Sequence, residues 1–490
     1  MDARRTGYHW IKHNIFISGL LCIIWFLLRT GTKPSRAIYP CQRAAATGGY
    51  LWLATFVLPL ISVIWTKRLR ECSRTKLIGG GIIILVVLSS IYGLYGLSGT
   101  FPTQSIGVAQ MNFTQHTAET APASTIFVVN GTSGDDGGVT TLLQLMEQHA
   151  IPFYSTLENR QKGLIGSNDV VIIKVNCQWD ERGGTNTDLV KALVRAIVSH
   201  PDRFTGEIVI ADNGQGQFGS TGSGGSLNYS RNNADDTSQS MQRVANSFAK
   251  DHRVSTYLWD SITTKRVDEY AIGDLTDGYI INATPNPQTG LLVSYPKFTT
   301  SYGTHVSFKM GIWNPINKTY DSDKLKVINV PVLKTHNTYG VTASVKHYMG
   351  VGSDKLTNEL GHSSHNTVGN GGMGTEMVET RFPTLNIIDA IRINAHPLQG
   401  PRTAYDQATQ TNVIAASTDP VALDYWSAKN VLLPTAQLLG YPDLSSMSPD
   451  NTAPGSFGTW LRLSMNEIHR AGYQATMSET SMNVFVAQVH

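Results

Sequence analysis

Side chains able to bind an anion stand at the ends of two predicted buried strands, 169–176 and 326–330. They are Lys174 and Asn176 at the first strand, and Lys334 and His336 after the second. Ligands of open α/β sheets bind beyond the carboxyl ends of the strands, where a cation and the free N–H groups of a helix hold an anion. The sequence therefore predicts a site for a small anionic ligand at this edge of the sheet.

Two threonines precede the helix predicted over 187–199. Thr185 and Thr187 have the spacing of a hydroxyl cap, and their hydroxyl groups would face the same anion. The alternative is that Thr187 only caps its helix and Lys174 is solvated.

A catalytic group is predicted around Lys334 and His336. Lys346, in the helix that follows, would add a third lysine to hold the anion by charge-assisted hydrogen bonds. His336 would exchange protons with the ligand, and Asp389, at the end of its own strand, would orient the imidazole.

Three histidines form a candidate metal site. His362 and His365 are three residues apart in a polar stretch, and His336 would join them if the loop folds back. Neutral imidazoles are common ligands of divalent metals. The alternative is that these histidines are solvated side chains of an irregular loop.

The elements that must position these residues alternate between strand and helix from Thr125 onward. Strands are predicted over 125–129, 169–176, 207–212, 326–330, 385–391 and 413–417, and helices over 139–149, 187–199, 341–349, 420–430 and 460–469. This alternation predicts an α/β fold with a mostly parallel sheet covered by helices. Extended segments between 279 and 309 predict a hairpin insertion.

Three apolar runs precede this domain. They comprise 16 uncharged residues after Lys12, 23 after Arg43, and 21 from Leu77 to Leu97. As helices the longer two can cross the roughly 30 Å hydrocarbon core, and the first, roughly 24 Å long, nearly reaches across it. We therefore expect a membrane anchor over 1–98, a linker over 99–124 and an α/β domain over 125–490. A cleaved signal peptide is the alternative for the first run.

The basic segment from Lys67 to Lys76 indicates the orientation in the membrane. It holds five Lys and Arg in ten residues, and short basic loops stay on the cytoplasmic side. The third span then leads outward, which predicts a multi-pass protein of the cell membrane with its C-terminal domain on the extracytoplasmic side. The bilayer is thus an expected partner.

Charge and cysteine content exclude several classes of protein. Residues 1–97 hold 12 Lys and Arg against two acids, whereas the remainder holds 27 bases and 34 acids, which disfavours a nucleic-acid-binding body. The four cysteines form no CxxCH or clustered motif, so a c-type haem and a Cys-ligated iron–sulfur cluster are excluded. Cys41 and Cys177 are expected outside, either paired or with Cys177 free and buried.

Two further motifs do not by themselves predict a ligand site. Gly214–Gly219 matches GxGxxG, but more Gly, Ser and Asn follow where a phosphate-binding helix should begin. Sequons for N-glycosylation begin at five asparagines, Asn112, Asn130, Asn228, Asn282 and Asn317.

Several segments together resemble the family called domain of unknown function 362. They are Val171–Asn176 with Gly184–Thr187, Val327–His336 with Gly340–Gly350, Asn386–Ile391 with Gly400-Pro401, and Ala416–Asp424. The resemblance covers roughly 169–430. It joins into one signature Lys174, Asn176, Thr187, Lys334, His336, Lys346, Asp389 and Asp419. It implies ligand binding for Asp419, whose place before Pro420 also predicts a helix N-cap.

Three functions fit this sequence. The first is an enzyme, of unknown reaction, that binds a small anion, a metal, or both at the strand ends. The second is a non-catalytic subunit or scaffold of a membrane complex. The third is an oxidoreductase with a non-covalent cofactor.

Overall fold

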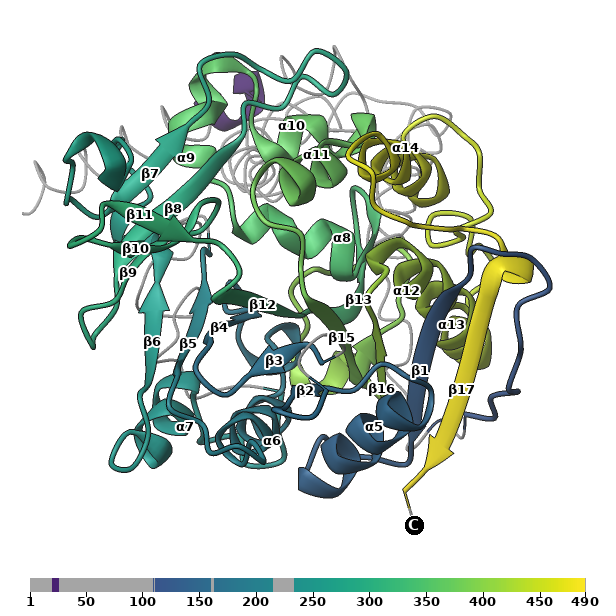
Figure 1. Cartoon of the computed structure of the whole chain (residues 1–490). Coiled ribbons are helices and arrows are strands. Elements are labelled where there is room, and N and C mark those ends of the chain that lie inside the picture. The colour runs from purple at the N-terminus through teal and green to yellow at the C-terminus, as the bar shows by residue number, and fades with distance from the viewer. Residues whose placement is uncertain (1–19, 26–108, 110, 160–162, 215–232, 490) are drawn as a thin grey trace, which may run out of the picture. The chain divides into compact units, whose positions relative to one another are not determined.

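The computed structural model describes residues 20–25, 109, 111–159, 163–214 and 233–489 (Figure 1). From residue 109 onward these residues belong to one compact unit, Thr103–His490. Residues 20–25 are helical, and the rest of the three predicted spans lies outside the described residues. Within the described part of the chain, no helix combines the length and the apolar character needed to cross a bilayer.

A ten-stranded sheet forms the centre of this unit. Eight strands follow one another in the order β17, β1, β16, β15, β12, β4, β5 and β6. Their bounds are β1 Ser124–Asn130, β4 Val170–Val175, β5 Glu207–Asp212, β6 Val254–Leu258, β12 Leu325–Val330, β15 Leu385–Asn394, β16 Thr409–Ser417 and β17 Met482–Gln488.

The strand directions confirm the predicted mostly parallel sheet. Strands β15, β12, β4, β5 and β6 run parallel, as do β1 and β17, whereas β16 runs antiparallel to both its neighbours. Both faces of β4 and β12 are buried, and such strands are rich in Val, Ile and Leu without a regular polar alternation. This is why the sequence indicated them clearly.

Three helices cover one face of the sheet (Figure 1). They are α5 (Asp136–Gln148), α6 (Thr187–Val198) and α7 (Met241–Phe248). Helix α6 buries Leu189, Leu193 and Ile197, which pack with Ile173 and Ile210 of the strands in one hydrophobic cluster. Two very short strands, β2 (Tyr154–Ser155) and β3 (Ile165–Gly166), flank this layer.

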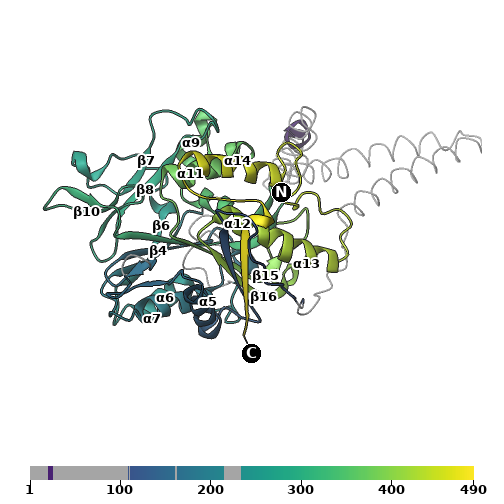
Figure 2. The same ribbon diagram turned by 45° about the vertical axis from the view of Figure 1, so that its right-hand side comes forward.

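A second set of helices lies on the opposite face (Figure 2). It comprises α8 (Ser344–His347), α9 (Asp354–Thr357), α10 (Ser364–Thr367), α11 (Gly372–Glu379), α12 (Pro420–Ser427), α13 (Leu433–Leu438) and α14 (Phe457–Arg470). Alternate strand residues such as Ile172 and Val209 face this layer. Lys174 therefore faces it too, because side chains on one face of a strand recur every second residue.

A smaller antiparallel sheet packs on the same side. It contains β7 (Gly278–Ile281), β8 (Ser294–Thr299), β9 (His305–Ser307), β10 (Gly311–Asn314) and β11 (Thr319–Asp321), paired in sequence order. Tyr279, Phe298 and Phe308 join its apolar face to the main core. These strands occupy the region predicted as a hairpin insertion.

Two local predictions differ from the structure. The helix predicted from Val341 begins only at Ser344, because the chain first forms a hairpin of β13 (Val332–His336) and β14 (Gly340–Thr342). The carboxylate of Asp424 accepts hydrogen bonds from the N–H groups of Ser344 and Val345, and it sets this start from a distant helix.

The fold also ends differently from the prediction. The helix predicted to close it is α14, but β17 follows and pairs in parallel with β1 at the edge of the sheet. Its short apolar run, Val484-Phe-Val, was not recognised as a strand in the sequence.

Candidate functional site

Lys174 is fully buried and paired with an acid. Its Nζ lies 2.8 Å from Asp212 Oδ1 and 3.1 Å from His347 Nε2. The other oxygen of Asp212 accepts the N–H of Cys177, which is a free, buried cysteine, at 2.6 Å. Burial lowers the pKa of Lys174, and the carboxylate of Asp212 acts in the opposite direction. The alternative of a solvated Lys174 is therefore wrong.

Asparagines extend this pair across the sheet. Asn329 lies beside Lys174 in the β-sheet register and Asn386 lies beside Asn329. The Asn329 amide donates to Asn386 Oδ1 at 2.9 Å and to the Ser344 carbonyl at 3.1 Å. Its own Oδ1 must therefore accept a hydrogen bond from His347 Nδ1, 2.7 Å away. We call Lys174, Asp212, His347, Asn329 and Asn386 the inner network.

The bonding pattern makes His347 a neutral imidazole. Its Nδ1 donates to Asn329, so Nε2 is left to accept a hydrogen bond from Lys174. Burial, followed by the charges of Lys174 and Lys334, holds the pKa of His347 well below its ordinary value.

Gly350 is required by close approach to this network. A Cβ atom at this position would lie 2.6 Å from Asp212 Oδ1 and 2.8 Å from Lys174 Nζ. Any side chain there would displace the ion pair. Gly350, the last residue of the motif Gly340–Gly350, is thus explained by its packing against the buried charges.

Lys346 is buried, and no carboxylate of the described residues lies within ion-pair distance of it. Among the described residues, its Nζ contacts the sulfur of Met349 at 3.6 Å and the ring of Tyr339, whose centroid is 5.2 Å away. Burial lowers its pKa to about 7, although the charge of Asp354 acts in the opposite direction. A thioether and a ring face are weak substitutes for water around an ammonium group.

Lys334 lies in the same region, on β13. Its Nζ is fully buried and donates to the carbonyl oxygen of Gly183. Burial, and then the charge of Lys346, lower its pKa to about 7. Asp212 and Asp389 act on it from a distance, but no carboxylate of the described residues lies within ion-pair distance.

His336 and Tyr339 lie close to these two lysines. The Nδ1 of His336 accepts the N–H of Thr338 at 3.1 Å, and its ring lies 5.1 Å from that of Tyr339. Burial, then the charges of Lys346, His365 and Lys334, hold the pKa of His336 well below its ordinary value. His336 is therefore a neutral acceptor next to cationic groups.

A carboxylate–imidazole pair that sequence reasoning missed completes this group. His365 Nδ1 hydrogen-bonds with Asp354 Oδ2, and the hydroxyl of Tyr339 donates to the carbonyl of His365. The side chain of His365 is 33% exposed, whereas Lys346 and His336 are buried. His365 thus gives this group its solvent-facing end. We call Lys334, His336, Tyr339, Lys346, Asp354 and His365 the outer cluster.

Asp389 does not orient His336, contrary to the prediction. It accepts the N–H of Asn186 at 2.8 Å, the side-chain amide of Asn233 at 3.1 Å and the N–H of Ile391 at 3.2 Å. Burial raises its pKa to about 6. Its contacts join β15 to the start of α6.

The start of α6 also differs from the prediction. Asn186, not Thr187, caps the helix, because its side-chain oxygen accepts the N–H groups of Asp188 and Leu189. Thr187 accepts the Gln239 amide at 2.8 Å instead. The segment Thr185-Asn186-Thr187 was predicted to cap the helix with a threonine hydroxyl, but the side-chain oxygen of Asn186 caps it equally well.

Thr185 and Asn176 join two strands. The hydroxyl of Thr185 accepts the N–H of Asn176 and donates to the carbonyl of Val330, both at 2.8 Å. Asn176 Oδ1 is buried without a hydrogen-bond partner among the described residues. These two side chains stabilise the loop that carries Gly183, the acceptor for Lys334.

Asp419 is the N-cap of α12, as its place before Pro420 predicted. One oxygen accepts the N–H groups of Val421 and Ala422, and the other accepts Ser124 and Thr476. Both oxygens are thus engaged in the protein, and these contacts place Asp419 apart from the lysines.

The three histidines predicted to bind a metal have separate partners. His362 Nδ1 lies 2.8 Å from the carbonyl of Gly290, His365 pairs with Asp354, and His336 accepts Thr338. Over the described ranges, no group of three or more His, Cys, Asp or Glu is placed to hold a metal ion.

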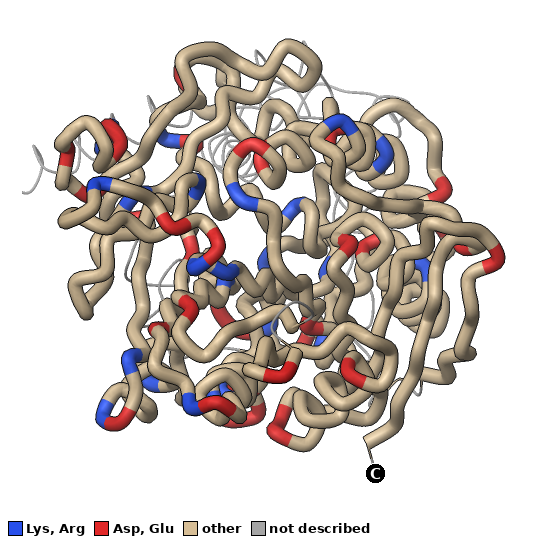
Figure 3. The backbone as a smooth tube through the Cα atoms, in the orientation of Figure 1, with Lys and Arg blue, Asp and Glu red and all other residues tan. Residues whose placement is uncertain are grey.

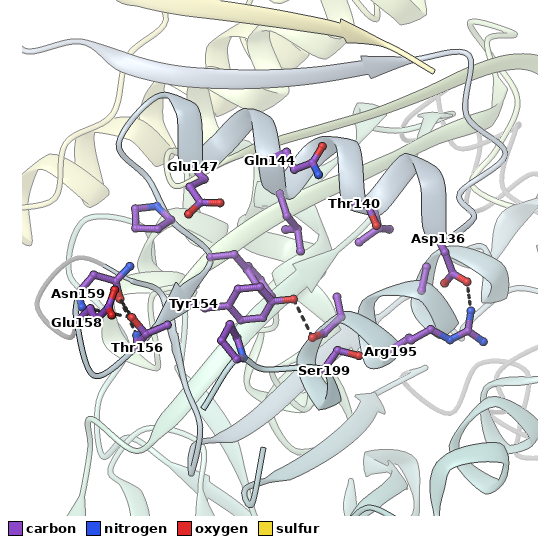
Figure 4. A pocket seen from close by; sticks show the side chains of 17 residues that line it. Asp136, Thr140, Gln144, Glu147, Tyr154, Thr156, Glu158, Asn159, Arg195 and Ser199 are labelled. Atoms are coloured by element: carbon purple, nitrogen blue, oxygen red, sulfur yellow. Dashed lines mark hydrogen bonds and ion pairs between the residues drawn. The ribbon is translucent and has the colours of Figure 1, made fainter. Parts of the chain in front are cut away.

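A cavity of about 590 Å³ lies between α5, α6 and the segment 152–159 (Figure 4). Asp136 pairs with Arg195 at one end, and Tyr154 donates to the carbonyl of Ala196 at 2.9 Å. None of the predicted site residues lines this cavity. It lies on the helical face opposite to the one that Lys174 faces.

Gly214 begins the GxGxxG match, and its N–H donates to Asp260 Oδ2 at 2.7 Å. The remaining residues of that motif lie outside the described residues. In the view of Figure 3, Lys and Arg are interspersed with Asp and Glu over the domain.

Comparison with known families agrees with the motifs. Residues 298–429 match the family described as Domain of unknown function (DUF362). The chain carries a DUF362 domain. The matched residues include Lys334, His336 and Lys346, whereas Lys174 precedes them. No curated protein matched the chain. Nor did any solved structure.

Proposed function

We propose that the DUF362-type domain binds a small anionic ligand at the outer cluster and is an enzyme that acts on it. The observation that carries this proposal is the burial of Lys334 and Lys346 without a carboxylate at ion-pair distance among the described residues. A buried charge is costly unless it is paired. An anion bound between these lysines would supply the missing negative charge.

Electrostatics favours such a ligand further. The pKa values of Lys334 and Lys346 are both lowered to about 7, mainly by burial. An anion raises the pKa of an adjacent amine, so binding would be accompanied by proton uptake. Each charge-assisted hydrogen bond to the ligand would contribute about 1.5–3 kcal/mol.

Acid–base groups border the same position. In this proposal Asp354 takes the orienting role, because its carboxylate hydrogen-bonds with His365 Nδ1. The Nε2 of His365 then faces away from the carboxylate and can exchange a proton. His336, a neutral imidazole 5.1 Å from the ring of Tyr339, is the second proton acceptor.

Calorimetric titration of the purified full-length chain with oxalate tests the anion site. We expect wild type to bind oxalate, and Lys346→Met to bind it at least about tenfold more weakly, since one charged hydrogen bond is lost. Lys355→Met, at an exposed position of α9, is the matched control and should bind as wild type does. Equal binding by all three, or none by wild type, contradicts the proposal and favours the scaffold interpretation.

Repeating the titration with a chelator separates two modes of binding. An anion held by lysines binds equally well with and without the chelator, whereas an anion held through a divalent metal is released. An absorption spectrum of the same preparation tests the oxidoreductase alternative, which requires a bound redox cofactor.

The proposed location is a membrane anchor with the domain on the extracytoplasmic side. It rests on the apolar runs before residue 98 and on the basic segment from Lys67 to Lys76. We expect Ile316→Cys, at an 88% exposed position, to react with a membrane-impermeant maleimide in intact cells. Cys72 should react only after permeabilisation, in a Cys41→Ser background that removes the outer-loop thiol. Labelling of Cys72 alone in intact cells would invert the proposed topology.

A further inference from the structure

The three lysines of the site have different surroundings. Lys174 has the carboxylate of Asp212 at 2.8 Å, and Lys334 donates to the carbonyl of Gly183. Within the described ranges, the polar or aromatic contacts of the Lys346 amine are a sulfur atom at 3.6 Å and the face of Tyr339. Among the described residues, Lys346 is thus the buried amine of the site with the weakest acceptors.

Such surroundings stabilise a neutral amine rather than an ammonium ion. An apolar pocket and a second cation nearby are the two conditions that activate a lysine as a nucleophile. Lys346 meets the first through its burial and the second through Lys334, on which its charge acts. The pKa of Lys346, lowered to about 7 by burial, agrees with this view.

We propose that Lys346 is a nucleophile that forms an imine with a small anionic carbonyl compound, such as a 2-oxo acid. The proposal rests on the anion-binding function of the outer cluster and names the class of ligand. Lys334, tethered to the Gly183 carbonyl, would hold the carboxylate of the ligand as an ammonium ion. Lys346, which lacks such a tether, would attack the adjacent carbonyl carbon.

The step is balanced without any other reactant. The Nζ lone pair of Lys346 forms a C–N bond to the carbonyl carbon, and the C–O double bond opens to give a carbinolamine. The remaining C–O bond then breaks, and the oxygen leaves as water with the two protons of the amine. Protonation of the imine nitrogen by solvent gives an iminium ion.

The neighbouring groups suit this chemistry. The ring of Tyr339 faces Lys346 at 5.2 Å, and a ring face stabilises an iminium cation as it does an ammonium. The hydroxyl of the same Tyr339 anchors the His365 carbonyl, so the partly exposed imidazole of His365 lies at the solvent side of the reacting amine. Small ligands would enter from this side.

Reductive trapping tests the proposal. The purified full-length chain is incubated with glyoxylate, an anionic aldehyde, and cyanoborohydride, and the modified peptide is identified by mass spectrometry. We expect one adduct, on Lys346, that forms at least about tenfold faster than any adduct on exposed Lys355. We expect its rate to rise with pH to a half-maximum near pH 7, because the neutral amine reacts.

Two variants keep the result interpretable. Lys346→Met replaces the amine by an apolar chain that suits the contact with Met349, and it should remove the adduct while oxalate still binds detectably at Lys334. Lys355→Met should react as wild type does. If Lys346→Met fails to fold, competition in wild type decides: oxalate should protect Lys346 from glyoxylate.

Failure of this inference is distinct from failure of the proposed function. Oxalate binding without a glyoxylate adduct on Lys346, or with the adduct on Lys334, overturns the imine and leaves the anion site. No oxalate binding and no adduct overturn both. An adduct of equal rate on Lys346 and Lys355 shows only surface reactivity and also overturns the inference.

Discussion

The inner network and the outer cluster show two ways to bury a lysine. Lys174 has Asp212 at 2.8 Å. A chain of hydrogen bonds continues from Lys174 through His347 and Asn329 to Asn386. Lys346 has a thioether and a ring face. Both sites belong to one domain and face the same layer of helices. The difference teaches that a buried lysine can be neutralised by a carboxylate within the fold, whereas one without such a partner among the described residues would be stabilised by the proposed anion.

The largest effect is expected from a substitution that breaks the inner network. Asp212→Ala leaves the Lys174 ammonium buried without a partner and should lower the free energy of unfolding by about 3–5 kcal/mol. Urea denaturation followed by tryptophan fluorescence measures this loss. The double variant Lys174→Met, Asp212→Ala is the control and should recover part of it. A loss below about 1 kcal/mol would show that the ion pair contributes little.

The pH dependence of stability distinguishes the two regions next. The pKa values of Lys334 and Lys346 lie near 7 in the folded chain and near the ordinary 10.4 in the unfolded chain. Between these values the unfolded state binds more protons, so stability rises with pH, by up to about 1.4 kcal/mol per pH unit for each lysine.

Denaturation of wild type and Lys346→Met at several values between pH 7 and pH 9 measures this slope. The variant should have a slope smaller by up to about 1.4 kcal/mol per pH unit. Parallel curves for the two proteins would show that Lys346 keeps its charge throughout this range. Buried acids act in the opposite direction at lower pH. Burial raises the pKa values of Asp389 and Asp419 to about 6, so their contribution to the free energy of unfolding falls as the pH rises toward 6.

The smallest expected loss of stability comes from the outer cluster at neutral pH. Lys346→Met leaves no acid unpaired at ion-pair distance among the described residues, and it removes an amine that is costly to bury as an ammonium ion, so it should not lower the free energy of unfolding at pH 7. Lys174→Met, by contrast, leaves Asp212 unpaired and should cost about 3–5 kcal/mol. Equal losses for these matched substitutions would remove the distinction between the regions.

Local sequence patterns predicted much of the fold. Strands β4 and β12 were predicted because strands buried on both faces are rich in Val and Ile, and α6 because its apolar residues recur on one face. The β13–β14 hairpin was not predicted, because Val332–His336 mixes Lys, Thr and His, and its pairing with β15 depends on a partner far along the chain.

The site shows the same limit. Lys334 and His336 could be singled out, because they follow a buried strand, and so could Lys346. Their partners could not, because Asp212 and Asp354 are ordinary acids until the chain brings them to Lys174 and His365. Asp389 was assigned to His336 because it was placed at the end of its strand, but β15 continues to Asn394, and Asp389 accepts the N–H of Asn186 instead.

Direct titration of the lysine side chains by NMR tests the central claim of a buried, unpaired pair that awaits an anion. In lysine-labelled full-length protein, we predict two Nζ groups that titrate near pH 7, one lost in Lys334→Met and the other in Lys346→Met. Adding oxalate should move both titrations to higher pH. Lysine signals that all titrate near 10 and do not respond to oxalate would contradict the account.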